Sequence, residues 1–137
     1  MTKLREVLLV DDLPADNFLN KLLLQRLDCA EKISMALNGR EALDYLTTPV
    51  DGARPDVELI ILDINMPIMD GWEFLEAYEK LPPEQRAAAV LMMLTTSMNP
   101  DDEARARSKE SIDRFAVKPL TEETFRRLLE EQFPGRF

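Results

Sequence analysis

Carboxylates, hydroxyls and one lysine directly follow apolar runs in four parts of the 137-residue sequence. Taken one at a time, each placement has an ordinary explanation, such as a helix cap before Pro14 or a solvated surface lysine. Taken together, the four placements predict one shared site at the ends of several buried strands. The groups are Asp11-Asp12 after "VLLV", Asp63 after "LIIL", Thr95-Thr96-Ser97 after "VLMML", and Lys118-Pro119 after "FAV".

These side chains, brought together, favour chemistry on a phosphoryl group. Three carboxylates a few ångströms apart repel by roughly 4 kcal/mol for each pair at 4 Å and an effective dielectric near 20. Lys118 can compensate one charge, and a hard divalent cation, Mg²⁺ or alternatively Mn²⁺, can compensate the remainder. Such a cluster neutralises and aligns a transferring phosphoryl group. Asp63 is the candidate nucleophile, because a carboxylate is ionised at neutral pH and needs no general base.

A parallel β-sheet would bring these residues to one edge. The apolar runs at 7–10, 59–62 and 90–94 are continuous rather than alternating, as expected for strands covered on both faces. Segments around Ile33 and Phe115 alternate more and carry charges, which suits strands nearer the sheet edges. Ligands bind beyond the carboxyl ends of the strands in such a sheet, where the reactive residues stand.

Segments with helical spacing separate the predicted strands. The strand-helix order, repeated five times, predicts an α/β fold with helices on both faces of the sheet. Asp70 with Glu73 forms a capping-box pattern, and Asn99-Pro100 fits another helix start. The helix from about Pro100 to Lys109 has few apolar residues and should pack weakly. The predicted apolar stripes are Leu19, Leu22, Leu23 and Leu27; Ala42, Leu43 and Leu46; Phe74, Leu75 and Tyr78; and Phe125, Leu128, Leu129 and Phe133.

The composition argues against several classes of function. With 26 acidic and 17 basic residues, the net charge of -9 disfavours binding to nucleic acids and to anionic membranes. The chain has no histidine, which removes imidazole catalysis and a role as a phosphohistidine carrier. Cys29 is the single cysteine, so no internal disulfide can form. We expect one cytoplasmic domain over 1–137, because no signal region or long apolar span is visible.

Four motifs in order, "LLVDD", "ILDINMPIMDG", "LTTS" and "FAVKP", resemble the receiver domains of bacterial two-component response regulators over about 5–133. This resemblance implies a flavodoxin-like, doubly wound, five-stranded parallel sheet in the order 2-1-3-4-5 with five helices. It implies a phosphoprotein of phosphorelay signal transduction, not an enzyme, whose phosphotransfer and dephosphorylation are self-catalysed. The segment "KLPPEQRAAAVLMMLTTS" and the long loop after Thr47 resemble the stand-alone regulators paired with bacterial phytochrome kinases.

The resemblance assigns roles to the acidic positions. Asp63 matches the phosphoacceptor of the family. Asp12, Asp63 and the backbone carbonyl of Asn65 match its Mg²⁺ ligands, and Asp11 matches the residue that supports a metal-bound water. Gly71 matches the family's structural glycine in the turn before a helix.

The resemblance also assigns the groups around the phosphoryl site. Lys118 would contact the phosphoryl group, and the Lys118-Pro119 peptide bond would be cis. Thr96 rather than Thr95 matches the switch hydroxyl, because it has the family's usual separation from Lys118. Phe115 takes the place of the switch aromatic, although an aromatic on a strand is as often only a packing residue.

Partners and output follow from the same resemblance. The phosphoryl donor would be a sensor histidine kinase or a histidine phosphotransfer protein. We expect no output domain, so the output would be a downstream protein partner, onward phosphotransfer, or a homodimer through the face between the fourth and fifth helices. The chain departs from the family at Ser111, since the family commonly has a glycine shortly before the switch aromatic. Without this glycine, the end of the fourth helix has no glycine cap.

Two alternative functions remain open at this point. An Mg²⁺-dependent phosphatase of the haloacid dehalogenase class also uses an aspartyl nucleophile, but it needs a second acid two residues later, where this chain has Asn65. A receiver-like interaction module that is never phosphorylated would retain the fold without the transfer. The intact set of acids and Lys118 argues against that module.

Overall fold

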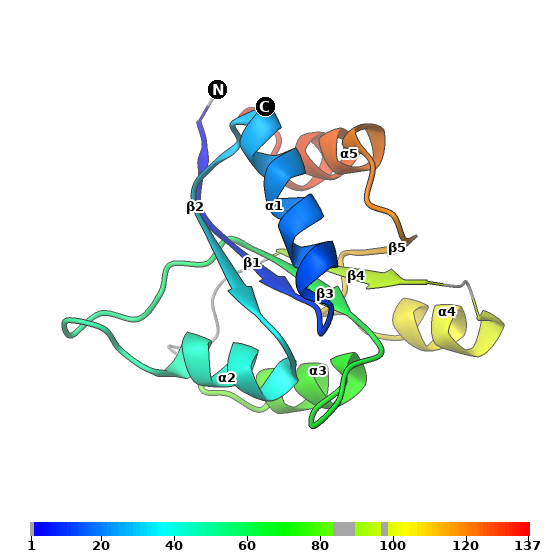
Figure 1. Ribbon diagram of the computed structural model, residues 1–137. Coiled ribbons are helices and arrows are strands. Elements are labelled where there is room, and N and C mark those ends of the chain that lie inside the picture. Colours follow the sequence, from blue (N-terminus) through cyan, green and yellow to red (C-terminus); the bar gives the residue numbers. More distant parts are fainter. Residues whose placement is uncertain (1, 84–89, 97–98) are drawn as a thin grey trace.

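The computed structural model describes residues 2–83, 90–96 and 99–137. Five parallel strands form one sheet in the order β2-β1-β3-β4-β5, which confirms the predicted fold (Figure 1). The strands are β1 (Leu4–Val10), β2 (Ala30–Ala36), β3 (Leu59–Asp63), β4 (Val90–Thr95) and β5 (Arg114–Val117). The helices are α1 (Pro14–Leu27), α2 (Gly39–Thr47), α3 (Gly71–Glu79), α4 (Pro100–Arg107) and α5 (Glu122–Gln132).

Two hydrophobic cores lie on opposite faces of the sheet. Helices α1 and α5 cover one face, where Leu24 and Phe125 pack with the strands. Helices α2 and α3 cover the other face, where Phe74 packs and Ala106 of α4 joins the same core. Both faces of the central strands are therefore buried, which explains the continuous apolar runs.

The strand register brings the reactive residues to the same edge of the sheet. Residues that immediately follow paired positions in neighbouring strands emerge side by side, so Asp11 lies next to Asp63, and Thr96 lies next to Lys118. The register pairs that fix this arrangement are Val10 with Leu62, Leu94 with Asp63, and Thr95 with Val117.

Helix α1 presents only part of the predicted face to the sheet: Leu23 is buried and Leu27 packs against the core. Leu19 and Leu22 are 60% and 45% exposed, so the predicted stripe was wrong at these two positions. The buried residues of α1 are Asn17, Leu23 and Leu24. Asn17 and Leu24 lie two helical turns apart and share one face. The Asn17 amide donates hydrogen bonds to the carbonyls at the ends of β1 and β2, and these bonds set the rotation of the helix.

The predicted starts of α3 and α4 are confirmed. The Asp70 carboxylate accepts from the backbone N–H of Glu73 at 2.8 Å, and the Glu73 carboxylate accepts from the N–H of Asp70 at 3.1 Å, which completes the capping box. At the start of α4, the Asn99 side chain accepts from the N–H of Asp101. Both helices therefore begin where their sequences provide side-chain caps.

Helix α4 has little buried surface. Ala106 is its buried residue, as the apolar-poor sequence predicts, and Ala104 is exposed. The Arg105 guanidinium lies 4.5 Å from the centre of the Trp72 ring and links α4 to α3. Helix α4 ends without a left-handed residue, and the Ser111 hydroxyl donates a hydrogen bond of 2.6 Å to Glu79. The segment after α4 is thus fastened to α3 in the absence of a glycine cap.

Within the described residues, no helix combines the length and the apolar character that are needed to cross a lipid bilayer.

Candidate functional site

Three carboxylates converge at the carboxyl edge of the sheet. Oxygens of Asp11, Asp12 and Asp63 lie within 4.8 Å of one another. Asp63 ends the central strand β3, and Asp11 and Asp12 directly follow β1. Asp11 and Asp63 are buried, at 3% and 6% exposed, while Asp12 is half-buried. The neighbouring strands therefore produce the close acid cluster that the sequence predicts.

Lys118 extends from the end of β5 into this cluster. Its Nζ lies 2.5 Å from Asp11 Oδ2, 3.0 Å from Asp16 Oδ2 and 3.5 Å from Asp63 Oδ1. The Lys118-Pro119 peptide bond is cis. The backbone N–H of Lys118 also donates to the Thr95 carbonyl at 2.7 Å, which fixes the start of the side chain beside β4.

Two residues that the sequence interpretation missed shape the cluster. Asp16, in the first turn of α1, is the second acid that binds Lys118. Its sequence signal is its place in the first turn of the helix that begins at Pro14, shortly after Asp11 and Asp12 at the end of β1. Asn17 donates hydrogen bonds of 3.0 Å to the Asp11 carbonyl and 3.2 Å to the Ala36 carbonyl, and so ties the ends of β1 and β2 to α1.

Burial and mutual repulsion perturb the cluster. Burial, and then the charge of Asp11, raise the pKa of Asp63 to about 6, against the attraction of Lys118. Burial also raises the pKa of Asp11 above its usual range. Burial lowers the pKa of Lys118, but hydrogen bonds to Asp11 and Asp16 outweigh it, so the pKa is raised overall and the lysine stays charged. One lysine thus leaves the negative charge of the cluster incompletely compensated.

The cluster has the donor chemistry of a divalent cation site. Hard divalent cations prefer oxygen ligands, and the three neighbouring carboxylates supply them. Burial and the charge of Asp11 raise the pKa of Asp63, and a cation beside its carboxylate would oppose both effects. Asn65 is exposed two residues after Asp63, at the start of the loop that leads to α3. The acids can therefore hold a metal ion.

The loop between β3 and α3 packs closely against Asp63, the candidate phosphoacceptor. The Gly71 N–H donates to the Ile64 carbonyl at 2.8 Å. A Cβ atom at Gly71 would lie 2.6 Å from the carbonyl oxygen of Asp63, closer than real contacts allow. The backbone of α3 therefore approaches Asp63 so closely that only glycine fits.

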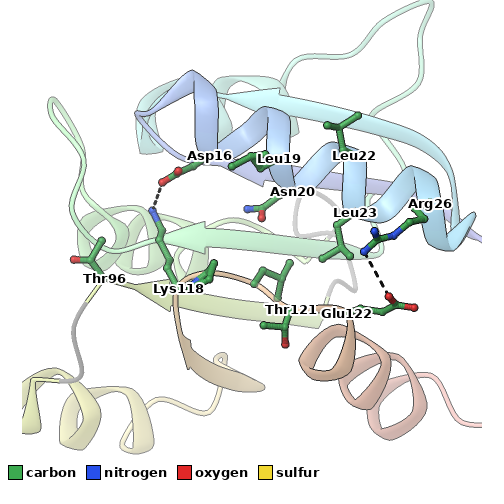
Figure 2. Close-up of a pocket in the computed structure, with 12 residues that line it drawn as sticks. Asp16, Leu19, Asn20, Leu22, Leu23, Arg26, Thr96, Lys118, Thr121 and Glu122 are labelled. Carbon is green, nitrogen blue, oxygen red and sulfur yellow. Dashed lines mark hydrogen bonds and ion pairs between the residues drawn. The ribbon is translucent and has the colours of Figure 1, made fainter.

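The predicted switch residues lie on two sides of the site. Thr96 is exposed just beyond β4, whereas Thr95 is buried. Thr96 shares the lining of a cavity of about 900 Å³ with Lys118 and Asp16, and Figure 2 shows the three side chains at one end of it. Phe115 is half-buried and packs against the core that contains Ala106 of α4. Ser97 and Met98 lie outside the described residues.

Comparison with known proteins gives a consistent result. Residues 7–130 match the model of the response regulator receiver domain. The chain is 34% identical over 125 residues to the probable methanogenesis regulatory protein FilR2 of Methanothrix harundinacea, covering 91% of this chain and 79% of that protein. It spans about half the length (52%) of the two-component response regulator ORR1 of Oryza sativa, at 30% identity over 89% of this chain.

Solved structures agree in fold. A response regulator receiver protein from Dyadobacter fermentans superposes with a TM-score of 0.81 at 30% identity, over 96% of this chain and 99% of that one. The bacteriophytochrome response regulator AtBRR superposes with a TM-score of 0.78 at 30% identity, over 94% and 92% of the two chains. A bacteriophytochrome response regulator is thus among the solved structures that this chain resembles.

Proposed function

Because this chain belongs to the response regulator receiver domain family, and is therefore a phosphoacceptor of two-component signalling, we propose that Asp63 is the residue that takes up the phosphoryl group. The observation that carries this proposal is the convergence of Asp11, Asp12 and Lys118 on Asp63 at one edge of the sheet. Asp63 occupies the end of the central strand β3. The carboxylates of Asp11 and Asp12 reach it from the β1 side of the sheet, and the Lys118 ammonium reaches it from the β5 side.

Mg²⁺ is the metal that this site would hold, with Mn²⁺ as a substitute. The Asp12 and Asp63 carboxylates and the Asn65 carbonyl would bind the ion, and Asp11 would hold a water bound to it. When present, the ion supplies positive charge for the oxygens of the transferring phosphoryl group. Lys118 supplies the second positive charge and contacts the phosphoryl group from the β5 side.

The transfer itself requires no general base. An oxygen of the Asp63 carboxylate attacks the phosphorus atom of a phosphohistidine on the donor protein, and a new P–O bond forms as the P–N bond breaks. The electron pair of the broken bond stays on the donor imidazole, which is then protonated from solvent. Hydrolysis later adds water to the phosphorus atom, releases inorganic phosphate and returns the carboxylate. Both steps are self-catalysed by the receiver.

The conformational response would involve Thr96, Phe115 and α4. The Thr96 hydroxyl would bind the phosphoryl group on Asp63, and Phe115 would move into the space that it leaves. The small buried surface of α4 supports this proposal, because a helix held mainly by Ala106 and the Arg105–Trp72 contact can shift at low cost.

Receiver domains pair with histidine kinases, and we propose a sensor histidine kinase or a histidine phosphotransfer protein as the donor here. We propose that residues 1–137 act in the cytoplasm as one receiver domain with its core at about 5–133. The output would be a downstream protein or a homodimer through the face between α4 and α5, and the net charge of -9 disfavours nucleic acid and anionic membranes as partners.

The rival functions are less well supported. An aspartyl phosphatase needs an acid at position 65, and the amide of Asn65 cannot serve as the general acid and base. An interaction module that is never phosphorylated would gain nothing from three neighbouring carboxylates, two of them buried, because such a cluster costs stability. We therefore favour the phosphoacceptor.

Intact mass after incubation with Mg²⁺ and acetyl phosphate tests the proposal. The wild type is expected to gain one phosphoryl group that is labile at alkaline pH, while Asp63→Asn and a sample with EDTA gain none. Phosphorylation by a cognate kinase, with loss of the phosphoryl group from the kinase, is the second arm of the test. A folded wild type that gains no mass in either arm would favour the interaction module.

A further inference from the structure

Lys118 has a second acidic partner that the proposed phosphoryl transfer does not need. Its Nζ is bound by Asp11 at 2.5 Å and by Asp16 at 3.0 Å, whereas Asp63 Oδ1 is 3.5 Å away, beyond the usual range of a strong hydrogen bond. We propose that Asp16 is a positioning residue that holds Lys118 away from Asp63 and thereby slows uptake of the phosphoryl group. This inference rests on the proposed function and describes how that site is regulated.

The contact joins two parts of the fold. Asp16 belongs to the first turn of α1, and Lys118 follows β5, so the hydrogen bond spans the end of the cavity between them (Figure 2). The Lys118 side chain is 11% exposed and the Asp16 side chain is 31% exposed. A half-buried pair of this kind is screened less by salt than a surface ion pair.

The consequence for the reaction follows from where the two acids hold the ammonium. A lysine ammonium has three N–H donors, and Asp11 and Asp16 each take one at hydrogen-bond distance. A phosphoryl group on Asp63 needs the same ammonium, which lies 3.5 Å from Asp63 Oδ1 and closer to both other acids, so Lys118 moves from α1 toward β3 during the transfer. The carboxylate of Asp16 resists this rotation and also repels an anionic phosphoryl donor. Both effects slow phosphorylation.

If Asp16 only supported the structure of α1, its removal would change the rate of phosphorylation in the opposite direction. An acid in the first turn of a helix interacts favourably with the helix dipole, so its removal would weaken α1. A weakened α1 would disturb Asn17 and the ends of β1 and β2, and phosphorylation would become slower. The direction of the change in rate therefore separates positioning from structural support.

The first experiment compares initial rates of phosphorylation by acetyl phosphate at saturating Mg²⁺. Asp16→Asn is expected to react about three to ten times faster than the wild type, as expected for the loss of one nearby charge and one lysine partner. Asp16→Glu, which keeps the carboxylate, is expected to restore a rate near that of the wild type. Asp28→Asn is the matched control, because it removes the same charge at the far end of α1, where Asp28 is the cap residue.

A second readout uses the protein without metal or phosphoryl donor. Thermal unfolding in EDTA is measured for Asp16→Asn, Lys118→Met and the double variant. The shifts in midpoint are expected to be non-additive, because the contact between Asp16 and Lys118 is lost in either single variant.

Each outcome has a defined meaning. A faster Asp16→Asn with an unchanged Asp28→Asn and non-additive unfolding supports the inference. An unchanged or slower Asp16→Asn, an equal acceleration in Asp28→Asn, or additive midpoints would overturn it while the wild type still takes up phosphoryl groups. A wild type that takes up none from acetyl phosphate or a kinase would overturn the proposed function and the inference with it.

Discussion

Gly71 lies directly against the backbone of Asp63, since a Cβ at position 71 would lie 2.6 Å from the Asp63 carbonyl oxygen and 2.9 Å from the Ile64 Cα. Both neighbours are main-chain atoms, so they cannot rotate away as a side chain could. The first turn of α3 and the end of β3 therefore form one rigid unit, and the position of the Asp63 carboxylate depends on the absence of a side chain at residue 71.

Gly71→Ala is expected to impair phosphorylation more than folding. The added methyl group must displace the backbone that carries Asp63, at a cost of about 1 to 3 kcal/mol in the free energy of unfolding. Gly39→Ala is the matched control for a crowded glycine whose Cβ would not touch Asp63, because that Cβ would lie 2.8 Å from the Met69 side chain, 2.9 Å from the Met69 carbonyl oxygen and 2.9 Å from Phe74 Cβ. Urea unfolding and the rate of phosphorylation by acetyl phosphate are measured for both variants. If the two variants are equally stable and lose the same fraction of the wild-type rate, Gly71 does not fix the position of Asp63 in a rigid unit.

Asp63→Asn is expected to stabilise the protein in EDTA. The buried Asp63 carboxylate, repelled by Asp11, has a pKa raised to about 6, so removing its charge should increase the free energy of unfolding at pH 7 by about 1 to 2 kcal/mol. Urea unfolding measures the change. Asp51→Asn, at an exposed turn position with φ of 53°, controls for the loss of one charge. A less stable Asp63→Asn would show that Lys118 already compensates the cluster.

In the presence of Mg²⁺, the wild type is expected to become more stable than Asp63→Asn. At millimolar Mg²⁺ the wild type should gain stability, because a ligand that binds only the folded state stabilises it in proportion to the logarithm of its concentration over the dissociation constant. Asp63→Asn should gain much less. The unfolding midpoints of both proteins, followed across a titration from EDTA to excess Mg²⁺, check this prediction, and parallel increases in the two would place the ion elsewhere.

Glu58 is expected to contribute stability that depends on pH. Its carboxylate binds Arg136 through contacts of 2.7 and 3.1 Å, and the hydrogen bond to Arg136 outweighs burial and lowers the pKa of Glu58. For an acid with a lowered pKa, the stabilisation is present above its unfolded value of about 4.3 and is lost as the pH falls through the folded value.

Glu58→Gln isolates this contribution. The variant should be about 1 to 3 kcal/mol less stable than the wild type at pH 7, and the difference should shrink below pH 4. Urea unfolding of both proteins at pH 7, 5 and 3.5 provides the comparison. A difference that stays constant across this range would mean that shape rather than charge is responsible.

Ile68→Asn is expected to stabilise the loop between β3 and α3. Ile68 is 80% exposed and has a φ of 68°, a left-handed conformation that β-branched residues rarely adopt. Asparagine tolerates this conformation better, so a gain of about 0.5 to 1 kcal/mol in the free energy of unfolding is expected. Ile68→Val, which keeps the branched Cβ, should show no gain in the same urea titration.

The sequence was sufficient for the fold and for the main members of the cluster because each signal there is local. Continuous apolar runs identify the buried strands, and the residue after each run marks the sheet edge. The rotation of α1 was not predictable in this way, since Asn17 is polar and is buried only because it bonds two strand ends. Asp16 was missed for a related reason: its contact with Lys118 depends on the same rotation of α1, and an acid in the first turn of a helix is already explained by the helix dipole.

The contact between Arg105 and Trp72 gives the molecule a built-in optical probe. Trp72 is the single tryptophan of the chain, it is 8% exposed, and it directly follows Gly71 at the start of α3. A guanidinium 4.5 Å from the indole ring alters its emission, so displacement of α4 would change the fluorescence of one identified residue. Stopped-flow mixing could then time the motion of α4 in unlabelled protein.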